Sequence, residues 1–291
     1  MATVYDQINS NNRKAFFLIF TFLILVIFIG WIFSYAFHNV FILYFAVIFS
    51  TLTSLVSYYN SDKVILGISQ AREIKKEDHQ ELYRIIENLA ITAGMKTPKL
   101  YIINEAQPNA FATGRNEEHA VVAVTQGLLD KLNKRELTAV LAHELAHIKS
   151  NDILINSVVV ILVGIIVLLS DFFFRFLYFG NSNNNKNPIL IVFAIISMLL
   201  APLAATIIKL AISRKQEYRA DAKGVLFTRD KDALISALIK ISSDKNELTK
   251  TNSAINHLYI SSPIKKKTNF YSKLFMTHPP LEERIRALEN T

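Results

Sequence analysis

The sequence contains no cysteine among its 291 residues. This absence excludes disulfide bonds, thiolate ligands for zinc and a cysteine nucleophile. Any metal ion must therefore be held by nitrogen and oxygen donors. The absence also fits a catalytic region that lies in a reducing compartment.

Charged side chains are missing from long blocks of the chain. Hydrophobic residues make up 51% of the sequence and the mean hydropathy is +0.28, which is high for a water-soluble protein. Blocks 15–37 and 40–59 hold no charged residue, and each can cross a hydrocarbon layer of about 30 Å at about 1.5 Å per residue. Further apolar blocks cover about 153–174 and 188–208. The sequence therefore predicts four transmembrane helices in two hairpins.

Two alternatives apply to these blocks. A cleaved signal peptide does not suit the first block, because its apolar run exceeds the usual length of about 7–15 residues and a second span follows at once. The last two blocks have Asp171, Arg175 and Lys209 near their ends. Buried helices of a soluble core are therefore the alternative to membrane spans for these two blocks.

The distribution of Lys and Arg predicts the orientation in the membrane. Basic residues flank both hairpins, and none lies between the first two blocks: Arg13, Lys14, Lys63, Arg72, Lys75, Lys76, Lys209, Arg214, Lys215 and Arg219. Because cytoplasmic flanks carry an excess of Lys and Arg, residues 60–152 and 209–291 are predicted to be cytoplasmic. The net charge of +8 fits basic segments beside anionic lipid. Nucleic-acid binding is not predicted, since no recognition motif accompanies the charge.

The pentapeptide His143-Glu-Leu-Ala-His147 carries the strongest chemical signal. Residues four apart share one face of a helix, so both histidines can bind one metal ion while Glu144 lies beside them. Apolar residues at helical spacing predict a helix over 137–148. Catalytic zinc lowers the pKa of its bound water to about 7, and a neighbouring carboxylate can take the proton. The pattern predicts hydrolysis, most often of a peptide bond; the alternative is an amphipathic helix with two histidines four apart by chance.

The third metal ligand must come from another element. The stretch 213–221 is predicted to be a helix, with Glu217 and Asp221 one turn apart on one face. One carboxylate could bind the metal and the other could accept a hydrogen bond from a metal-bound histidine. The alternative is a solvated helix in which Glu217 pairs with a basic neighbour. Asp152 also has two possible roles: it could accept a hydrogen bond from a histidine, or it could be a charge at the membrane interface.

Several segments together resemble one family. They are the pentapeptide, the first hairpin, Asn109-Ala-Phe-Ala112, Ser213-Arg-x-x-Glu-Tyr-x-Ala-Asp221 and Thr277-His-Pro-Pro-Leu-Glu-Glu-Arg-Ile-Arg-Ala-Leu288. This combination resembles the HtpX family of bacterial membrane zinc metallopeptidases, relatives of the CAAX prenyl endopeptidases. The resemblance implies one Zn²⁺ per subunit with Glu217 as third ligand, Asp221 orienting a histidine, and a zincin-like α+β domain with a small sheet beside the spans.

The substrate side rests on two predicted strands. Residues 99–103 and 120–125 are rich in β-branched and aliphatic side chains. An exposed strand edge can bind an extended polypeptide as an additional strand, which selects the backbone more than the sequence; an ordinary small sheet is the alternative. By the resemblance, Asn109, Ala110 and Phe111 line the cleft.

The sequence does not identify the residue that stabilises the transition state. Candidates are His278, Tyr218 and Arg219, and His278 has the alternative role of a turn residue before the final helix. The remaining histidines show no partner spacing and are predicted to be surface or loop residues: His38, His79, His119 and His257.

The predicted function is therefore that of a zinc-dependent membrane endopeptidase in which Glu144 is the base. Its predicted organisation is a hairpin in 1–60, a protease part in 61–152, a second hairpin in 153–212 and a second protease part in 213–291. The resemblance implies cleavage of misfolded or unassembled membrane proteins at the cytoplasmic face of the bacterial inner membrane. Alternatives are an intramembrane protease, a CAAX-type prenyl-protein endopeptidase and a non-catalytic metal-binding scaffold; the presence of Glu144 argues against the last. The sequence does not indicate an oligomeric state.

Overall fold

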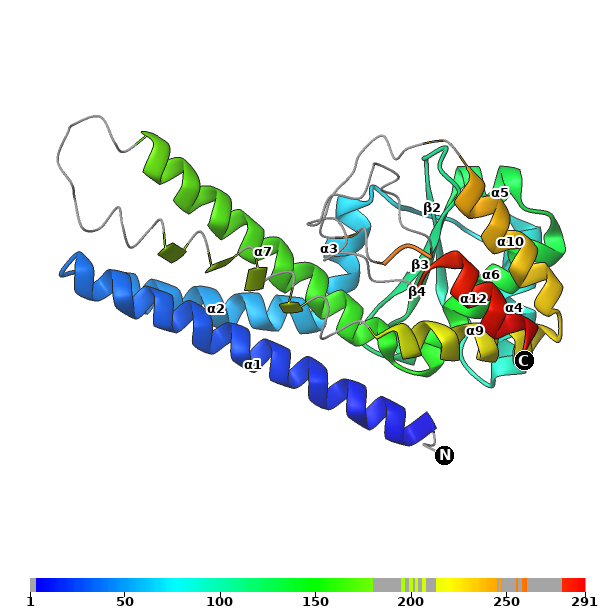
Figure 1. The fold of residues 1–291 in the computed structure, drawn as a ribbon, viewed down its shortest axis with the longest axis horizontal. Coiled ribbons are helices and arrows are strands. Elements are labelled where there is room, and N and C mark those ends of the chain that lie inside the picture. The colour runs from blue at the N-terminus through cyan, green and yellow to red at the C-terminus, as the bar shows by residue number, and fades with distance from the viewer. Residues whose placement is uncertain are drawn as a thin grey trace.

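Three long helices extend from a part of the molecule that contains a β-sheet in the computed structural model (Figure 1). The described residues are 4–179, 195–196, 199–200, 202–203, 206–207, 213–244, 246, 255, 258–260 and 279–290. The long helices are α1 (Val4–Ala36), α2 (Phe41–Tyr59) and α7 (Asp152–Phe179). We refer to the rest of the described chain as the catalytic part.

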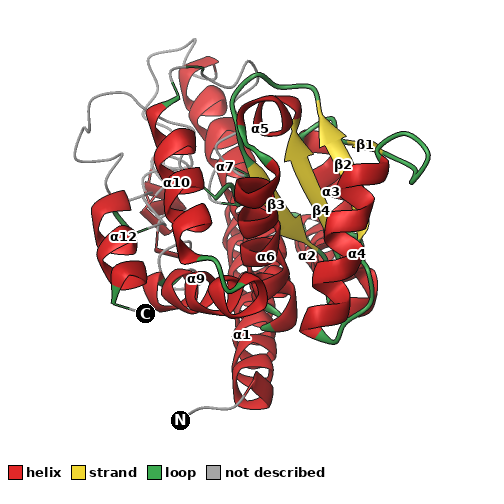
Figure 2. Cartoon of the chain, turned by 90° about the vertical axis from the view of Figure 1, so that its right-hand side faces the viewer, coloured by secondary structure: helices red, strands yellow, loops and turns green. Residues whose placement is uncertain are grey.

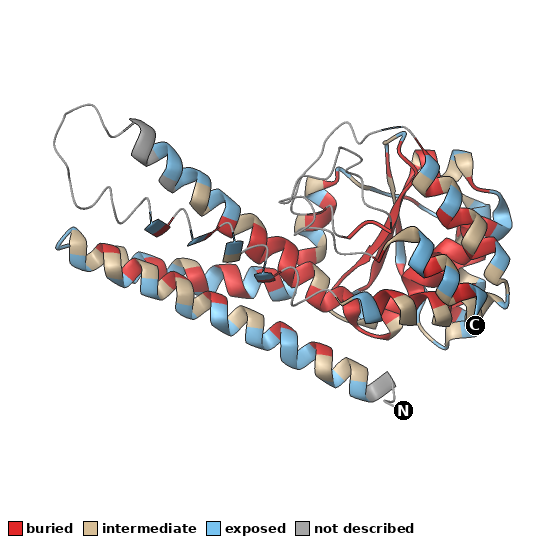
Figure 3. Ribbon diagram, in the orientation of Figure 1, coloured by how far each residue is buried: buried red, intermediate tan, exposed pale blue. Residues whose placement is uncertain are grey.

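Each of the three long helices has a segment that is long and apolar enough to cross a membrane. These segments are Asp6–Ala36, Phe41–Tyr59 and Asp152–Phe172. Many side chains on α1 and α2 are exposed, including large aromatic ones, as a surface in contact with lipid would be (Figure 3). The first three apolar blocks are thus confirmed as candidate spans. The predicted fourth span, 188–208, lies mostly outside the described residues.

Close backbone contact holds α1 and α2 together. The two helices are joined by residues 37–40, and a Cβ atom built on Gly30 of α1 would lie 2.2 Å from Cβ of Ala46 on α2. A side chain at position 30 would therefore force the helices apart. Helix α7 packs against α1 and is more deeply buried than either, because its first half also contacts the sheet (Figure 3).

The catalytic part is built around a four-stranded mixed sheet with the strand order β1-β2-β4-β3. The strands are β1 (Arg72–Glu73), β2 (Lys99–Ile103), β3 (Ala110–Thr113) and β4 (Val121–Thr125). Strands β2 and β4 run parallel, whereas β3 pairs with β4 antiparallel and forms one edge. The strands expected over 99–103 and 120–125 are confirmed, the second beginning one residue later.

Both faces of the central strands are covered. Alternate residues point to opposite faces, so Val122 and Val124 of β4 join the core beneath α4 and α6, while Val121 and Ala123 pack toward α3 and α7. All five residues of β4 are therefore buried: four are apolar, and the fifth, Thr125, caps α5. A half-exposed strand would instead alternate between apolar and polar side chains.

The remaining helices pack around this sheet, with α6 at the centre (Figure 2). They are α3 (Ser61–Ile68), α4 (Gln80–Ala93), α5 (Gln126–Lys131), α6 (Lys134–Lys149), α9 (Arg214–Thr228), α10 (Lys231–Ser243) and α12 (Leu281–Glu289), with a 3₁₀ turn η1 (Glu117–His119). Helix α6 lies between the sheet and α9 and α10. It includes the helix predicted over 137–148 and begins three residues before it.

A sharp bend connects α6 directly to the membrane helix α7. Helix α6 ends at Lys149, and Asn151 has a left-handed backbone with φ of 53°. Asparagine tolerates this conformation better than most residues. Helix α7 starts one residue later, at Asp152. The pentapeptide thus lies within a few residues of a candidate membrane span.

Candidate metal centre

Helix α6 places the pentapeptide in the interior of the catalytic part. A capping box starts the helix: the Asn133 side chain accepts from the Glu136 amide, and the Glu136 side chain accepts from the Asn133 amide. Glu136 is held further by Lys240 and Ser236 of α10, at 2.8 and 2.6 Å. From residue 139 to residue 148 every side chain is buried. The histidines therefore stand on a rigid element.

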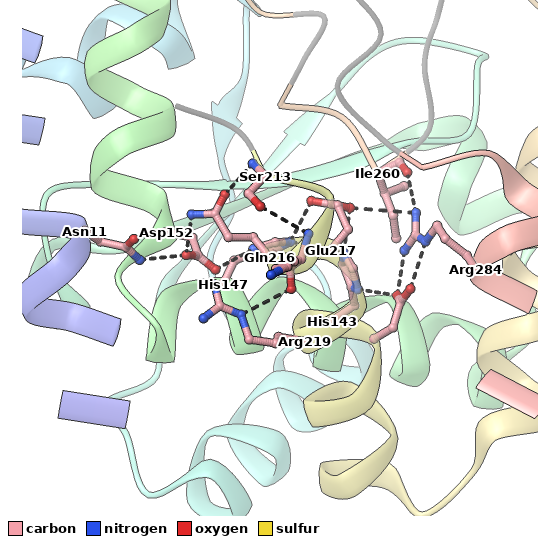
Figure 4. Close-up of polar contacts among 12 residues, drawn as sticks. Asn11, His143, His147, Asp152, Ser213, Gln216, Glu217, Arg219, Ile260 and Arg284 are labelled. Carbon is pink, nitrogen blue, oxygen red and sulfur yellow. Dashed lines mark hydrogen bonds and ion pairs between the residues drawn. The ribbon is translucent and has the colours of Figure 1, made fainter. Parts of the chain in front are cut away.

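The structure brings His143, His147 and Glu217 together, although Glu217 follows them by 70 residues. Helix α9 lies along α6 and directs Glu217 toward the two rings (Figure 4). The two Nε2 atoms are 3.2 Å apart. Glu217 Oε1 lies 3.5 Å from Nε2 of His147, and Oε2 lies 3.9 Å from Nε2 of His143. All three residues are buried.

These distances suit one tetrahedral metal ion. Bonds of about 2.0–2.1 Å at tetrahedral angles put ligand atoms about 3.3–3.4 Å apart. The two Nε2 atoms, 3.2 Å apart, and the Oε1–Nε2 distance of 3.5 Å to His147 are close to this value, and the other oxygen of Glu217 lies 3.9 Å from Nε2 of His143. Two imidazoles and one carboxylate are a donor set that zinc commonly takes in hydrolases. Among the described residues, one group of three potential ligands lies close enough together to hold one metal ion: His143, His147 and Glu217.

Each histidine has a carboxylate at its other ring nitrogen. Nδ1 of His143 lies 2.9 Å from Oδ1 of Asp221, and Nδ1 of His147 lies 3.2 Å from Oδ2 of Asp152. A carboxylate at Nδ1 favours a proton there and leaves Nε2 as the metal-binding atom. Of the two roles considered for Asp152, the structure supports that of an acceptor for a histidine, because Asp152 contacts His147.

The local charges perturb two of these groups. Burial disfavours a charged ring at His147, but the hydrogen bond with Asp152 and the charge of Glu217 outweigh it and raise the pKa of His147 to about 9. Burial also disfavours a charged Asp221, yet the neighbouring Arg284 and His143 lower the pKa of Asp221 to about 2. A metal cation at the three facing ligand atoms would replace the proton that this acidic environment favours on His147.

Arg284 of α12 is a part of the site that the sequence reasoning missed. Its Nε and Nη2 atoms donate to the two oxygens of Asp221 at 2.9 and 2.6 Å, and Nη1 donates to the carbonyl of Ile260 at 3.1 Å (Figure 4). Arg284 is 3% exposed. A signal was available, since Arg284 shares a helical face with Leu281 and Leu288 and so puts a charge in an apolar stripe.

Gly224 lets α9 approach α6 closely at the site. A Cβ atom at position 224 would lie 3.1 Å from the backbone nitrogen of His143 and 3.2 Å from its Cα atom. Gly224, Asp221 and Glu217 are spaced so that they lie on one face of α9. The glycine therefore brings both carboxylates within reach of the histidines.

The other predicted site residues have different surroundings. Glu144 is buried beside the histidines, and its charge contributes to the raised pKa of His147. Asn109 and Ala110 are buried at the start of β3, and the Ala110 carbonyl accepts from the Ile260 amide at 3.1 Å. Phe111 is fully buried, with its ring 5.5 Å from that of Tyr259, so it packs in the core.

Two of the three candidates for transition-state stabilisation, Tyr218 and Arg219, bond to residues other than the three ligands. The Tyr218 hydroxyl donates to Glu283 at 2.9 Å, and Nε of Arg219 donates to the carbonyl of Lys215 at 3.2 Å. His278 lies outside the described residues. His119 is exposed and contacts Asn116, as expected for a loop histidine.

Comparison with known proteins places the chain in a family. The family model described as peptidase family M48 matches residues 76–291, which include every residue of the site described above. The chain belongs to peptidase family M48. The metallopeptidase class expected from the pentapeptide is thus confirmed, and so is the resemblance to HtpX proteins.

The curated relatives of this M48 peptidase match it over nearly the full length. A protein named "Protease HtpX homolog" from Dictyoglomus turgidum is 40% identical over 291 residues, covering 98% of this chain and 94% of the relative. A second of that name, from Thermoanaerobacter pseudethanolicus, is 40% identical over 299 residues, covering 99% and 98%. The crystal structure of S. mikatae Ste24p has a similar fold, with a TM-score of 0.53 and 23% identity, covering 98% of this chain and 67% of that one.

Proposed function

We propose that this M48 peptidase is a zinc-dependent membrane endopeptidase that cleaves misfolded or unassembled membrane proteins. His143, His147 and Glu217 are the proposed zinc ligands, with one ion per subunit. The observation that carries the proposal is the close grouping of three buried residues: the two Nε2 atoms lie 3.2 Å apart, the two oxygens of Glu217 lie 3.5 and 3.9 Å from them, and both histidines have a carboxylate at Nδ1. A solvated helix with a chance pair of histidines would not need this arrangement.

Glu144 is the proposed catalytic base. When bound, zinc polarises the scissile carbonyl and makes a water molecule acidic enough to lose a proton near neutral pH. Glu144 takes that proton and later delivers it to the leaving amine. Asp221 and Asp152, which lie 2.9 and 3.2 Å from Nδ1 of the two histidines, would favour a proton at each Nδ1 and so leave each Nε2 free to bind zinc.

The substrate is proposed to bind as an extended segment along β3, the edge strand next to α6. Backbone pairing of this kind favours unfolded chains of any sequence. The amide of Ile260 already occupies the carbonyl of Ala110 at the first residue of β3. A substrate strand would therefore pair with the rest of the edge, starting beyond Ala110.

We further propose that the protein is a multi-pass protein of the bacterial inner membrane, with both termini and the metal site on the cytoplasmic side. The three candidate spans and the basic residues at their flanks support this topology. In this arrangement the second hairpin, in 153–212, separates the two protease parts in sequence and brings α6 and α9 together in space. The partners are then a lipid bilayer and polypeptide substrates.

Three alternative functions find less support. An intramembrane protease would need its zinc helix in lipid, but α6 lies between a sheet and two helices of the catalytic part. The fold is shared with Ste24p, but a fold alone does not assign a prenylated substrate. A non-catalytic metal-binding scaffold has no need for Glu144 buried beside the metal ligands.

The test compares Glu144→Gln with the wild-type chain, purified in detergent and incubated with casein or an unfolded membrane protein. We expect Glu144→Gln to keep its zinc and to lose cleavage by about 10²-fold or more. Glu136→Gln is a matched control, because Glu136 is another buried glutamate of α6 but bonds to Lys240. The control should cleave normally when folded. Equal cleavage by Glu144→Gln and wild type would exclude Glu144 as the base.

The ligand assignment has a separate test. Glu217→Ala should lower the zinc content at a fixed chelator concentration, because two histidines alone bind zinc weakly. Metal analysis of the purified variant measures this directly. An unchanged content of one zinc per chain would remove Glu217 from the ligands.

A further inference from the structure

The first membrane helix is longer than a membrane requires. Helix α1 has 33 residues, about 50 Å at 1.5 Å per residue, whereas a hydrocarbon core is about 30 Å thick. Its apolar run begins at Ala15, so residues 4–14, which we call the N-terminal extension, are available for other contacts. In Figure 1 the N-terminal end of α1 continues past the start of α7 toward the catalytic part.

The N-terminal extension contacts the polar residues behind the metal site. The Nδ2 atom of Asn11 donates to Oδ1 of Asp152 at 2.7 Å and to the carbonyl of Ser150 at 3.0 Å (Figure 4). Asn11 is 3% exposed, which is unusual for an asparagine. The other oxygen of Asp152 contacts Nδ1 of His147 at 3.2 Å. A chain of contacts therefore runs from the first membrane helix to a proposed zinc ligand.

Asp152 needs more than one partner to hold its orientation. Its Oδ1 atom accepts from Asn11 and from Nε2 of Gln216 at 3.0 Å, and these two donors come from α1 and α9. Gln216 also caps the start of α9 through the Ser213 amide. Without Asn11 the Oδ1 atom would keep the donor from α9 but lose the donor from α1, and the ring of His147 would lose part of its support.

We propose that Asn11 is a positioning residue of the metal site, which holds Asp152 against His147 and makes the N-terminal extension of α1 a part of that site. The proposal rests on the proposed zinc site. Positioning of Asp152 is a different role from docking of α1 on the catalytic part, because α1 also makes contacts there that do not involve Asp152. Asn12 accepts from Asn151 at 2.7 Å, and Gln7 accepts from Lys223 at 3.1 Å.

The experiment compares Asn11→Leu with Asn12→Leu in the full chain in detergent, with zinc affinity measured by competition with a chelator. Both variants replace an asparagine of the same helix by a side chain of similar size. Loss of a partner behind a metal ligand commonly lowers metal affinity by about 10–100-fold. Because Asn11 contacts Asp152 and not the histidine itself, we expect the zinc affinity to fall by about tenfold for Asn11→Leu and by less than about twofold for Asn12→Leu. Asn11→Ala, which adds no bulk, should behave as Asn11→Leu does.

A double-mutant cycle separates positioning from a merely structural role. If Asn11 acts through Asp152, Asn11→Leu should weaken zinc binding in the wild-type chain and add less than about twofold in an Asp152→Ala chain. A tenfold loss in both backgrounds would overturn the proposal, as would equal affinities of the Asn11 and Asn12 variants. Absence of zinc binding by the wild-type chain would instead contradict the proposed function.

Discussion

Replacing Gly224 by alanine should weaken the metal site without replacing a ligand. The added Cβ atom would lie 3.1 and 3.2 Å from backbone atoms of His143, whereas carbon atoms in contact are ordinarily about 3.5–4.0 Å apart. Helices α9 and α6 must therefore separate by a few tenths of an ångström. Neither neighbour is a flexible side chain that could turn aside.

The size of the effect follows from the two carboxylates on the same face of α9. Bond lengths in a metal site must lie within about 0.2 Å of their preferred values, so a shift of a few tenths of an ångström in Glu217 is large enough to require readjustment of the site. We expect the zinc affinity of Gly224→Ala to fall by about tenfold, which corresponds to about 1.4 kcal/mol. Overpacking should cost about 1–3 kcal/mol of stability, partly offset by about 1 kcal/mol of helix propensity.

The assay is a zinc titration against a competing chelator, together with the thermal midpoint of the metal-free chain. Gly67 of α3 supplies the control, because a Cβ atom there meets no other atom within 4 Å. Gly67→Ala should leave zinc affinity unchanged and stabilise the chain by up to about 1 kcal/mol. If Gly224→Ala bound zinc as tightly as wild type and stabilised the chain as Gly67→Ala does, the close approach of α9 to α6 would be wrong.

Three further predictions concern stability. Arg284→Ala should cost about 3–5 kcal/mol in denaturant unfolding, because it leaves a buried carboxylate without its cation, whereas the exposed Arg286 of the same helix should tolerate alanine. The contacts of Glu136 lower its pKa below 4.5, so they stabilise the chain above that pH. The thermal midpoints of wild type and Glu136→Gln should therefore converge as the pH falls below about 4.5. A constant difference between the two midpoints down to about pH 3 would count against this. Gly30→Ala should destabilise the α1–α2 hairpin by about 1–3 kcal/mol in detergent, and Ala46→Gly in the same chain should restore it; failure of that rescue would argue against the contact.

Local patterns were sufficient to predict several elements. Helical periodicity and the absence of charge located α1, α2 and α7, and β-branched residues located β2 with the same bounds as the structure. The spacing within the pentapeptide indicated two ligands. These features depend on neighbours in sequence, which is why the sequence alone reveals them.

Contacts between distant segments were not predictable in the same way. Spacing alone left Glu217 open between ligand and surface charge, and only the packing of α9 on α6 brings it to the histidines. The contact of Asn11 with Asp152 joins residues 141 positions apart, and that of Arg284 with Asp221 joins residues 63 apart. A buried asparagine or arginine has no periodic signature of its own, because its partners lie on other elements.

The most direct test of the proposed site is the position of the metal itself. Crystals of the full chain grown with zinc should give one anomalous peak per chain at the zinc absorption edge. We predict that this ion lies about 2.0–2.1 Å from Nε2 of His143 and of His147, and about 2.0–2.2 Å from a carboxylate oxygen of Glu217. A zinc ion bound elsewhere, or bound by the two histidines with Glu217 turned away, would contradict the proposed metal centre.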